Sequence, residues 1–453
     1  MLREAETTPA GSAASVPRDQ LTVELGGVGT ATWQRELRAG QTRVLRGAIA
    51  LGLAAGESLP LPTEGVQALV QADRLDVDAW AAALEPLGAS AGGVGGAAPA
   101  SPTAAASPAV QAAGAPAADT PADYLPTRFA LRTRELSAQG RTLHQVLLAG
   151  SREGGLWRAN CSADELEGYA EYRPANAREG GRDGAHGSAA GQLYARLARM
   201  RLPPSQAAQI EDLFAEQPSS LPALDVVVED FELRGRKLGR VEVEAQNRGG
   251  DGAAREWRLA KFNISAPEAS LTASGNWALL GGANAGNSSV AASASRQRRT
   301  ALNFRLDIRN AGELLARFGM EHVVRRGKGV MEGQVAWMGA PMNPDYRSMS
   351  GQVHLDVQSG QFLQADPGLA KLLGVLSLQA LPRRLTLDFR DVFSEGFAFD
   401  FVRGDVRIER GVASTNNLQM KGVNAAVLME GSADMNHETQ DLHVVVVPEL
   451  NAM

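Results

Sequence analysis

The sequence predicts a mainly β protein whose strands form an elongated, curved antiparallel sheet with a few short helices. Three observations lead to this fold class. Apolar residues recur at every second position along many segments, which is the periodicity of a strand with one buried face. Glycine reaches 49 of 453 residues while aromatic residues make up 5%, a composition that favours turn-rich β structure over long helices. Strand and hairpin patterns also repeat along the chain, as they do in stacked architectures.

The chain is expected to divide into three parts. Residues 1–88 form a β-rich segment that ends in a short helix, because Leu75-Asp76-Val77 leads into a stretch closed by Gly88. Residues 89–123 are almost wholly Ala, Gly, Pro and Ser. That composition cannot bury enough apolar surface to offset its ordering entropy, so we expect a disordered linker. Residues 124–453 form the second β region.

Weak internal repeats support strands and hairpins in this second region. The segment Leu306-Asp307-Ile308 precedes Gly319 at the same spacing as the first strand-to-helix pattern. Residues 262–277 and 418–433 align without gaps, and each predicts an antiparallel hairpin. A short amphipathic helix is expected near residues 366–380, because Asp366-Pro-Gly is a helix start and leucines follow at helical spacing.

The strands of this region alternate between apolar and polar residues. Phe397, Phe399 and Phe401 are the sharpest example, since Ala398 and Asp400 lie between them and all three rings are expected on one face. Such a face is either a core covered by a second layer or the lining of an open trough, and the residues alone favour the covered core. The same pattern gives the other candidate lining residues: Val353, Leu355, Val357, Leu385, Leu387 and Phe389.

Charge and cysteine content exclude several classes of function. The net charge is −6 and the isoelectric point near 5.7, so no basic field attracts nucleic acid. Cys161 is the single cysteine, which excludes an internal disulfide and a multi-cysteine metal site. No cofactor motif occurs, and we expect no cofactor.

The sequence also shows no arrangement typical of an enzyme. No catalytic signature for a nucleophile, a zinc site or a phosphate loop occurs. His437 and His443 form the closest histidine pair, but a surface position is a better explanation than metal binding. Arg383 and Arg384 are candidate contacts to a lipid phosphate, because arginine offers bidentate donors, although two arginines that open a strand are more often simply solvated.

Neither an export signal nor a membrane anchor is apparent in the sequence as it stands. Residues 1–17 contain acidic and polar residues where a signal peptide needs a basic and then an apolar run. No stretch of 18 or more uncharged apolar residues occurs. We therefore expect either a cytoplasmic protein or an internal piece of a larger exported one.

Several motifs in the last part of the chain resemble a known family. The run from Gly374 to Phe393, the following Gly396-Phe-Ala-Phe-Asp, and the segment from Arg403 to Ile408 are similar to the YhdP subgroup of AsmA-like proteins. The closing segment from Val444 to Ala452 resembles the same subgroup, and the resemblance covers roughly residues 200–451. No catalytic residues are implied by it.

The resemblance implies a non-enzymatic phospholipid transport protein with a long apolar β-groove. Such a protein is periplasmic, is anchored in the inner membrane by an N-terminal helix, and supports the barrier of the outer membrane. Its partners would be phospholipid acyl chains and the two membranes, and this chain would be a C-terminal portion without the anchor. The competing hypothesis is a structural or adhesive β-solenoid, which buries its apolar face inside a closed coil.

Overall fold

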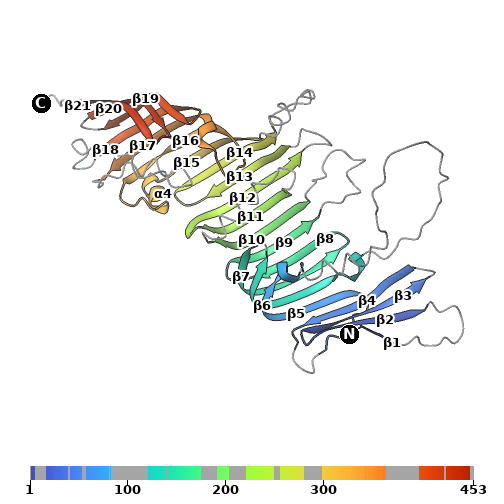
Figure 1. The fold of residues 1–453 in the computed structure, drawn as a ribbon. Coiled ribbons are helices and arrows are strands. Elements are labelled where there is room, and N and C mark those ends of the chain that lie inside the picture. The colour runs from blue at the N-terminus through green and yellow to red at the C-terminus, as the bar shows by residue number, and fades with distance from the viewer. Residues whose placement is uncertain are drawn as a thin grey trace, which may run out of the picture. The chain divides into compact units, whose positions relative to one another are not determined.

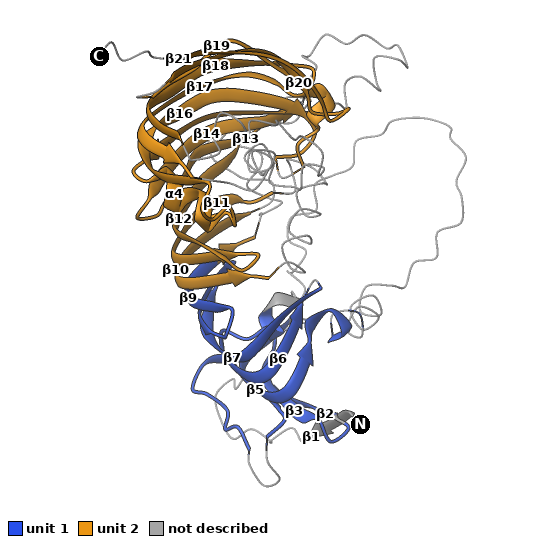
Figure 2. Cartoon of the chain, turned by 90° about the vertical axis from the view of Figure 1, so that its left-hand side faces the viewer, with its two compact units in different colours: residues 1–171 blue, residues 172–453 orange. Residues whose placement is uncertain are grey.

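The computed structural model places the chain in two compact units, residues 1–171 and residues 172–453, coloured separately in Figure 2. The structure describes these residues: 2–5, 17–38, 41–53, 58–80, 82, 121–138, 140–174, 191–203, 221–248, 256–279, 298–341, 343–363, 397–422 and 425–448.

Unit 1 is a sheet in which strands that follow one another in the sequence pair side by side (Figure 1). The β4–β5 and β5–β6 pairs are parallel, and the other pairs from β1 to β8 are antiparallel. Its strands are β1 (Leu2–Ala5), β2 (Arg18–Leu25), β3 (Gly29–Arg38), β4 (Gln41–Leu51), β5 (Gly65–Asp76), β6 (Arg128–Ala138), β7 (Arg141–Glu153), β8 (Leu156–Ser162) and β9 (Leu166–Arg173).

The β4–β5 and β5–β6 pairs are parallel exceptions in a sheet that is dominated by antiparallel pairs, as the sequence predicts. A parallel pair of consecutive strands also needs a long connection. A parallel neighbour requires the connection to return along the strand, which for the 12 residues of β5 is about 40 Å. The predicted linker at 89–123 therefore joins two paired strands of one sheet. Its last residues begin a 3-10 helix, η1 (Pro121–Tyr124), so the linker was predicted too long at that end. Residues 83–120 lie outside the described residues.

The helix expected after Leu75 is present in its described part. Residues 77–80 are helical, and the Asp76 carboxylate accepts a hydrogen bond from the Ala79 backbone nitrogen at 2.9 Å. This contact is an N-cap, which satisfies a backbone donor at the start of the helix.

Unit 2 is a sheet of twelve described strands, of which β10 and β11 are parallel and all pairs from β11 to β21 are antiparallel. Its strands are β10 (Gln192–Leu202), β11 (Ala223–Leu233), β12 (Arg236–Arg248), β13 (Glu256–Ser265), β14 (Ala269–Leu279), β15 (Arg298–Ile308), β16 (Val324–Met338), β17 (Ser350–Phe362), β18 (Phe397–Glu409), β19 (Val412–Gly422), β20 (Ala425–Asp434) and β21 (Thr439–Pro448).

Unit 2 is a meander, because each strand from β11 onward pairs with the strands before and after it in the sequence. The predicted hairpins at 262–277 and 418–433 are the β13–β14 and β19–β20 pairs. A β-solenoid instead stacks its coils through non-consecutive parallel pairs, so this pairing contradicts the solenoid hypothesis for the described strands. Figure 2 shows that β16–β20 are strongly arched. The predicted class of a curved, mainly β sheet with few helices is confirmed.

One helix, α4 (Ala311–Arg317), follows β15 as the second strand-to-helix pattern predicts. The Asn310 side chain caps it by accepting from the Glu313 nitrogen, and Gly319 takes a φ of +81° just after its end. A 3-10 helix, η2 (Tyr346–Ser348), precedes β17. The helix predicted near 366–380 lies outside the described residues. Among the described helices, none is long and apolar enough to cross a membrane.

Candidate functional site: an apolar face of twelve strands

One face of unit 2 carries uninterrupted apolar rows that run across the strands. Residues that are paired across neighbouring strands point to the same face of a sheet, so the register determines which side chains adjoin. Between β18 and β19 the row continues because an added Cβ at Gly404 would lie 2.7 Å from the Leu418 Cα atom. Row 1 crosses all twelve strands and consists of Leu197, Val228, Val241, Ile264, Leu271, Leu306, Met331, Leu355, Gly404, Leu418, Met429 and Val444.

Two further rows lie beside row 1 on the same face. Together the three rows define the surface called here the apolar face. Row 2 consists of Ala195, Val226, Val243, Phe262, Ala273, Phe304, Gly333, Val353 and Val406. Row 3 consists of Leu193, Leu224, Ala245, Leu259, Gly275, Leu302, Val335, Gly351, Ile408, Ala413 and Ala433.

The opposite face of the same strands is polar and carries ion pairs. Glu242 accepts from both Arg240 and Lys261, and the pKa of its carboxyl is lowered, chiefly by the Lys261 hydrogen bond. Farther along the sheet, the His354 imidazole lies 2.8 Å from an Asp405 carboxylate oxygen, in the row that also holds Glu332. Each of these strands therefore has one polar, solvent-exposed side and one apolar side.

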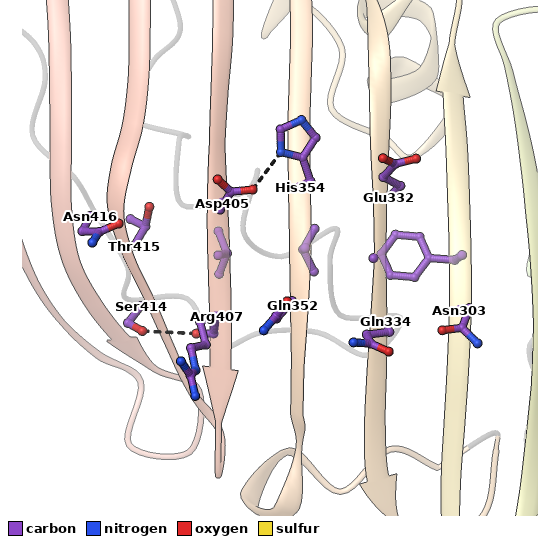
Figure 3. Close-up of a pocket in the computed structure, with 14 residues that line it drawn as sticks. Asn303, Glu332, Gln334, Gln352, His354, Asp405, Arg407, Ser414, Thr415 and Asn416 are labelled. Carbon is purple, nitrogen blue, oxygen red and sulfur yellow. Dashed lines mark hydrogen bonds and ion pairs between the residues drawn. The ribbon is translucent and has the colours of Figure 1, made fainter.

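A hollow of about 780 Å³ is lined by residues of β15–β19 (Figure 3). Its lining combines four residues of row 2, namely Phe304, Gly333, Val353 and Val406, with polar residues next to them in the sequence and with Ser414, Thr415 and Asn416 of β19. The Ser414 hydroxyl donates to the backbone oxygen of Arg407 at 3.3 Å, while His354 contacts Asp405. The hydroxyl is therefore not bonded to the imidazole as a nucleophile and its base would be.

The described residues contain no group of three or more His, Cys, Asp or Glu side chains placed to hold a metal ion. The His437 Nδ1 atom lies 2.8 Å from a carboxylate oxygen of Asp434 and forms a hydrogen bond with it. This hydrogen bond is the largest of the contributions that lower the pKa of Asp434 to about 2. His443 lies 3.4 Å from Glu430 instead of beside His437. Each of the two histidines thus pairs with a different carboxylate, and the two imidazoles do not converge on one site.

One end of the strands is covered by α4 and the residues that follow it. Here an apolar cluster, called the capped cluster, joins α4 to β15–β20. Ala311 at the start of α4 lies over Gly327 and Val357, close enough that an added Cβ at Gly327 would meet the Ala311 Cβ at 3.1 Å. The buried members are Ile308, Ala311, Met320, Val323, Val324, Val357, Phe397, Phe399, Met420, Ala425 and Val427.

An ion pair fixes α4 to a neighbouring turn. Arg317 in its last turn binds the Glu268 carboxylate through two nitrogens, one of them at 2.9 Å, and also donates to the Lys237 backbone oxygen. Glu268 is 3% exposed. Burial acts to raise the pKa of Glu268, but the Arg317 and backbone hydrogen bonds outweigh it and lower the pKa. The covering helix is therefore anchored by a buried charge pair.

The structure brings part of the predicted site together. Val353 lies in row 2 and Leu355 in row 1, both half-buried, while Val357 is 8% exposed in the capped cluster. Phe397 and Phe399 also belong to that cluster at 6% and 5% exposed, so both rings are covered. The remaining candidates lie outside the described residues: Leu385, Leu387, Phe389, Arg383 and Arg384.

The prediction that all three phenylalanines share a face is wrong for Phe401. Between the pairs Phe399–Gly422 and Phe401–Lys421, β18 has one residue more than β19, and this bulge at Asp400 reverses the alternation. Phe401 consequently lies on the polar face, where its ring stacks under the Arg403 guanidinium with 4.1 Å from the guanidinium carbon to the ring centre. A bulge of this kind leaves no clear trace in the period of the sequence.

Comparisons with known proteins identify the family of the chain. The family model described as YhdP protein matches residues 6–453. Over 219 residues the chain is 30% identical to the Intermembrane phospholipid transporter YhdP of Escherichia coli (strain K12). That alignment covers 48% of this chain and 16% of the relative, so the chain matches only a small part of that longer protein. No solved structure matches. Because the family model covers almost its whole length, the chain belongs to the YhdP protein family.

Proposed function

We propose that the chain is a non-enzymatic, periplasmic segment of a protein that moves phospholipids between the inner and outer membranes. In this proposal the acyl chains travel along the apolar face of unit 2, in the direction across the strands. The phospholipid transport thereby supports the barrier of the outer membrane. The name of the Escherichia coli relative, which specifies intermembrane phospholipid transport, supports the substrate class.

Row 1 is the observation that carries the proposal. Twelve strands at a spacing of about 4.8 Å extend an apolar path over about 53 Å in the direction across the strands. A core needs apolar residues only where a second layer covers them, whereas row 1 continues through strands on which its side chains are half-buried. An uninterrupted row of this length is what a sliding hydrocarbon chain requires.

The energetic argument is the cost of exposing hydrocarbon to water. Moving a chain of about sixteen carbons out of a bilayer costs on the order of 13 kcal/mol, at ~0.8 kcal/mol for each CH₂ group. Apolar rows lower this barrier along the path without favouring either end. Transport of this kind needs no reacting group, and the direction of net movement is set by the membranes and partners at the ends.

The capped cluster changes where lipid contact is expected. Because Phe397 and Phe399 are covered and Leu355 packs against the capped cluster, we place the acyl chains on the half-buried part of row 2, around Phe304 and Val353. We propose that the apolar face is the concave one. Side chains converge on the concave side of a curved sheet and are therefore less exposed, and the side chains of the apolar face are less exposed than those of the polar face on the same strands.

Photo-crosslinking tests the proposal with a matched control on the same strand. A benzophenone side chain at Val353 should capture phospholipid in cells that make the protein in its natural envelope setting. The same group at Gln352, one residue away on the polar face, should not. Equal lipid capture at both positions, or capture of protein alone at Val353, would contradict transport along the apolar face.

A further inference from the structure

A row of buried tryptophans closes the apolar face at the end of the strands opposite to α4. Trp257 pairs with Trp277, Trp277 pairs with Thr300, and Thr300 pairs with Trp337. These four residues are 4%, 2%, 1% and 5% exposed, respectively. The row lies next to row 3, because Thr300 is two residues before Leu302 on β15. It therefore forms a buried margin of the apolar face.

The three indoles of this margin differ in their hydrogen bonding. Trp257 donates to the backbone oxygen of Pro222 at 3.3 Å, and Trp337 donates to that of Ala340 at 2.9 Å. The buried Nε1 of Trp277 finds no acceptor in the part of the chain that the structure describes. An unsatisfied buried donor is unfavourable, so Trp277 is the one position in the row where a ligand acceptor would be stabilising.

A cation lies directly beside this donor. Arg298 is the first residue of β15 and shares the face of Thr300, with its guanidinium carbon 5.6 Å from the Trp277 ring centre. Burial lowers the pKa of Arg298, which means that its charge is partly desolvated. Its neighbour Arg299 is exposed on the polar face. Arg298 is thus a positive group at the margin of an otherwise apolar surface.

We propose that Arg298 and the Trp277 indole N–H bind the phosphate of a phospholipid whose acyl chains lie on rows 2 and 3. The guanidinium offers two parallel donors that match phosphate oxygens, and the indole adds a third. Hydrocarbon would extend from this point over Leu302 and Phe304. The inference rests on the proposed function and adds to it a headgroup position, so that a passing lipid has a defined orientation.

Competition between two lipids with identical chains tests the site. The purified full chain is equilibrated with mixed micelles of dipalmitoyl phosphatidylethanolamine and dipalmitoylglycerol and repurified, and the bound lipids are quantified by mass spectrometry. The wild type should prefer the phospholipid. Arg298→Gln should lower the ratio of bound phospholipid to diacylglycerol about tenfold, while total lipid stays similar. Arg299→Gln, on the other face, should leave the ratio unchanged.

The other outcomes are equally informative. An unchanged ratio of bound phospholipid to diacylglycerol in Arg298→Gln overturns the headgroup site. A wild type that binds both lipids equally also overturns this site, but it leaves the proposed lipid binding intact. A wild type that binds neither lipid overturns the proposed function as well. Inorganic phosphate should not displace the bound phospholipid, since it has no chains to bury, and displacement would indicate a free-phosphate site instead. If Arg298→Gln unfolds, Arg298→Met keeps the apolar stem over Trp277 and repeats the test.

Discussion

Replacing Phe399 and Phe401 separately by alanine tests the corrected arrangement of β18. The Phe399 ring is 5% exposed, lies 5.1 Å from the centre of the Phe362 ring, and covers Gly360 so closely that an added Cβ there would come within 2.3 Å of it. Removing a ring packed in this way costs about 3–5 kcal/mol through lost burial and the cavity left behind. Phe401→Ala removes a half-buried ring and one contact to Arg403, for which about 1 kcal/mol is expected.

The assay is urea unfolding of both variants and the wild type, followed by circular dichroism and by hydrogen exchange of β17–β19. Hydrogen exchange reports on this part of unit 2 by itself, which is useful because a chain of two units does not unfold in one step. Protection in β17–β19 should fall strongly in Phe399→Ala and only slightly in Phe401→Ala. Comparable losses in both variants, or a larger loss in Phe401→Ala, would refute the bulge at Asp400 and the covering of Phe399.

Three further outcomes are expected. Gly360→Ala should destabilise unit 2 by about 1–3 kcal/mol, because the new Cβ would overlap the Phe399 ring, and a neutral result in urea unfolding would contradict that packing. The pKa of Glu268 is lowered, so the Arg317 pair stabilises the fold above the usual carboxyl pKa, and this stabilisation is lost as the pH falls below that value and through the lowered pKa. In hydrogen exchange, protection of α4 in the wild type should therefore fall only below about pH 4, whereas Glu268→Gln should be poorly protected at every pH. Val353→Glu should leave the melting temperature almost unchanged, since this side chain is half-buried, yet bound lipid measured by mass spectrometry should fall; an unfolded variant would mean that row 2 is a closed core there.

The local structure of this chain follows from its sequence to a large extent. Alternation of apolar and polar residues predicts strands such as β11, β12 and β17, and the Asp-to-Gly spacing predicts the helix after β15. These patterns depend on neighbours within one element, which the sequence displays directly. The absence of catalytic motifs and the resemblance to the YhdP family also come from the sequence, and the family is confirmed.

The register between strands is decided only in the tertiary structure. Row 1 contains one residue from each of twelve strands, and backbone pairing between the strands aligns these residues. The alternation within a strand does not determine which residue of the next strand lies opposite. The β5–β6 and β10–β11 pairs are parallel. Whether two consecutive strands pair in parallel depends on the end of the first strand to which a long connection brings the chain back, and composition does not determine this.

Small departures from regular pairing have the largest effect on the candidate site. One extra residue at Asp400 moves Phe401 to the polar face while Phe397 and Phe399 stay on the apolar one. The burial of Phe399 likewise depends on residues far away in the chain, since its ring packs against Phe362 and Gly360 of β17. The sequence by itself determines that this protein has alternating strands with an apolar side. Only the folded sheet decides which apolar side chains are buried under a helix and which form open rows, because that depends on contacts between residues far apart in the chain.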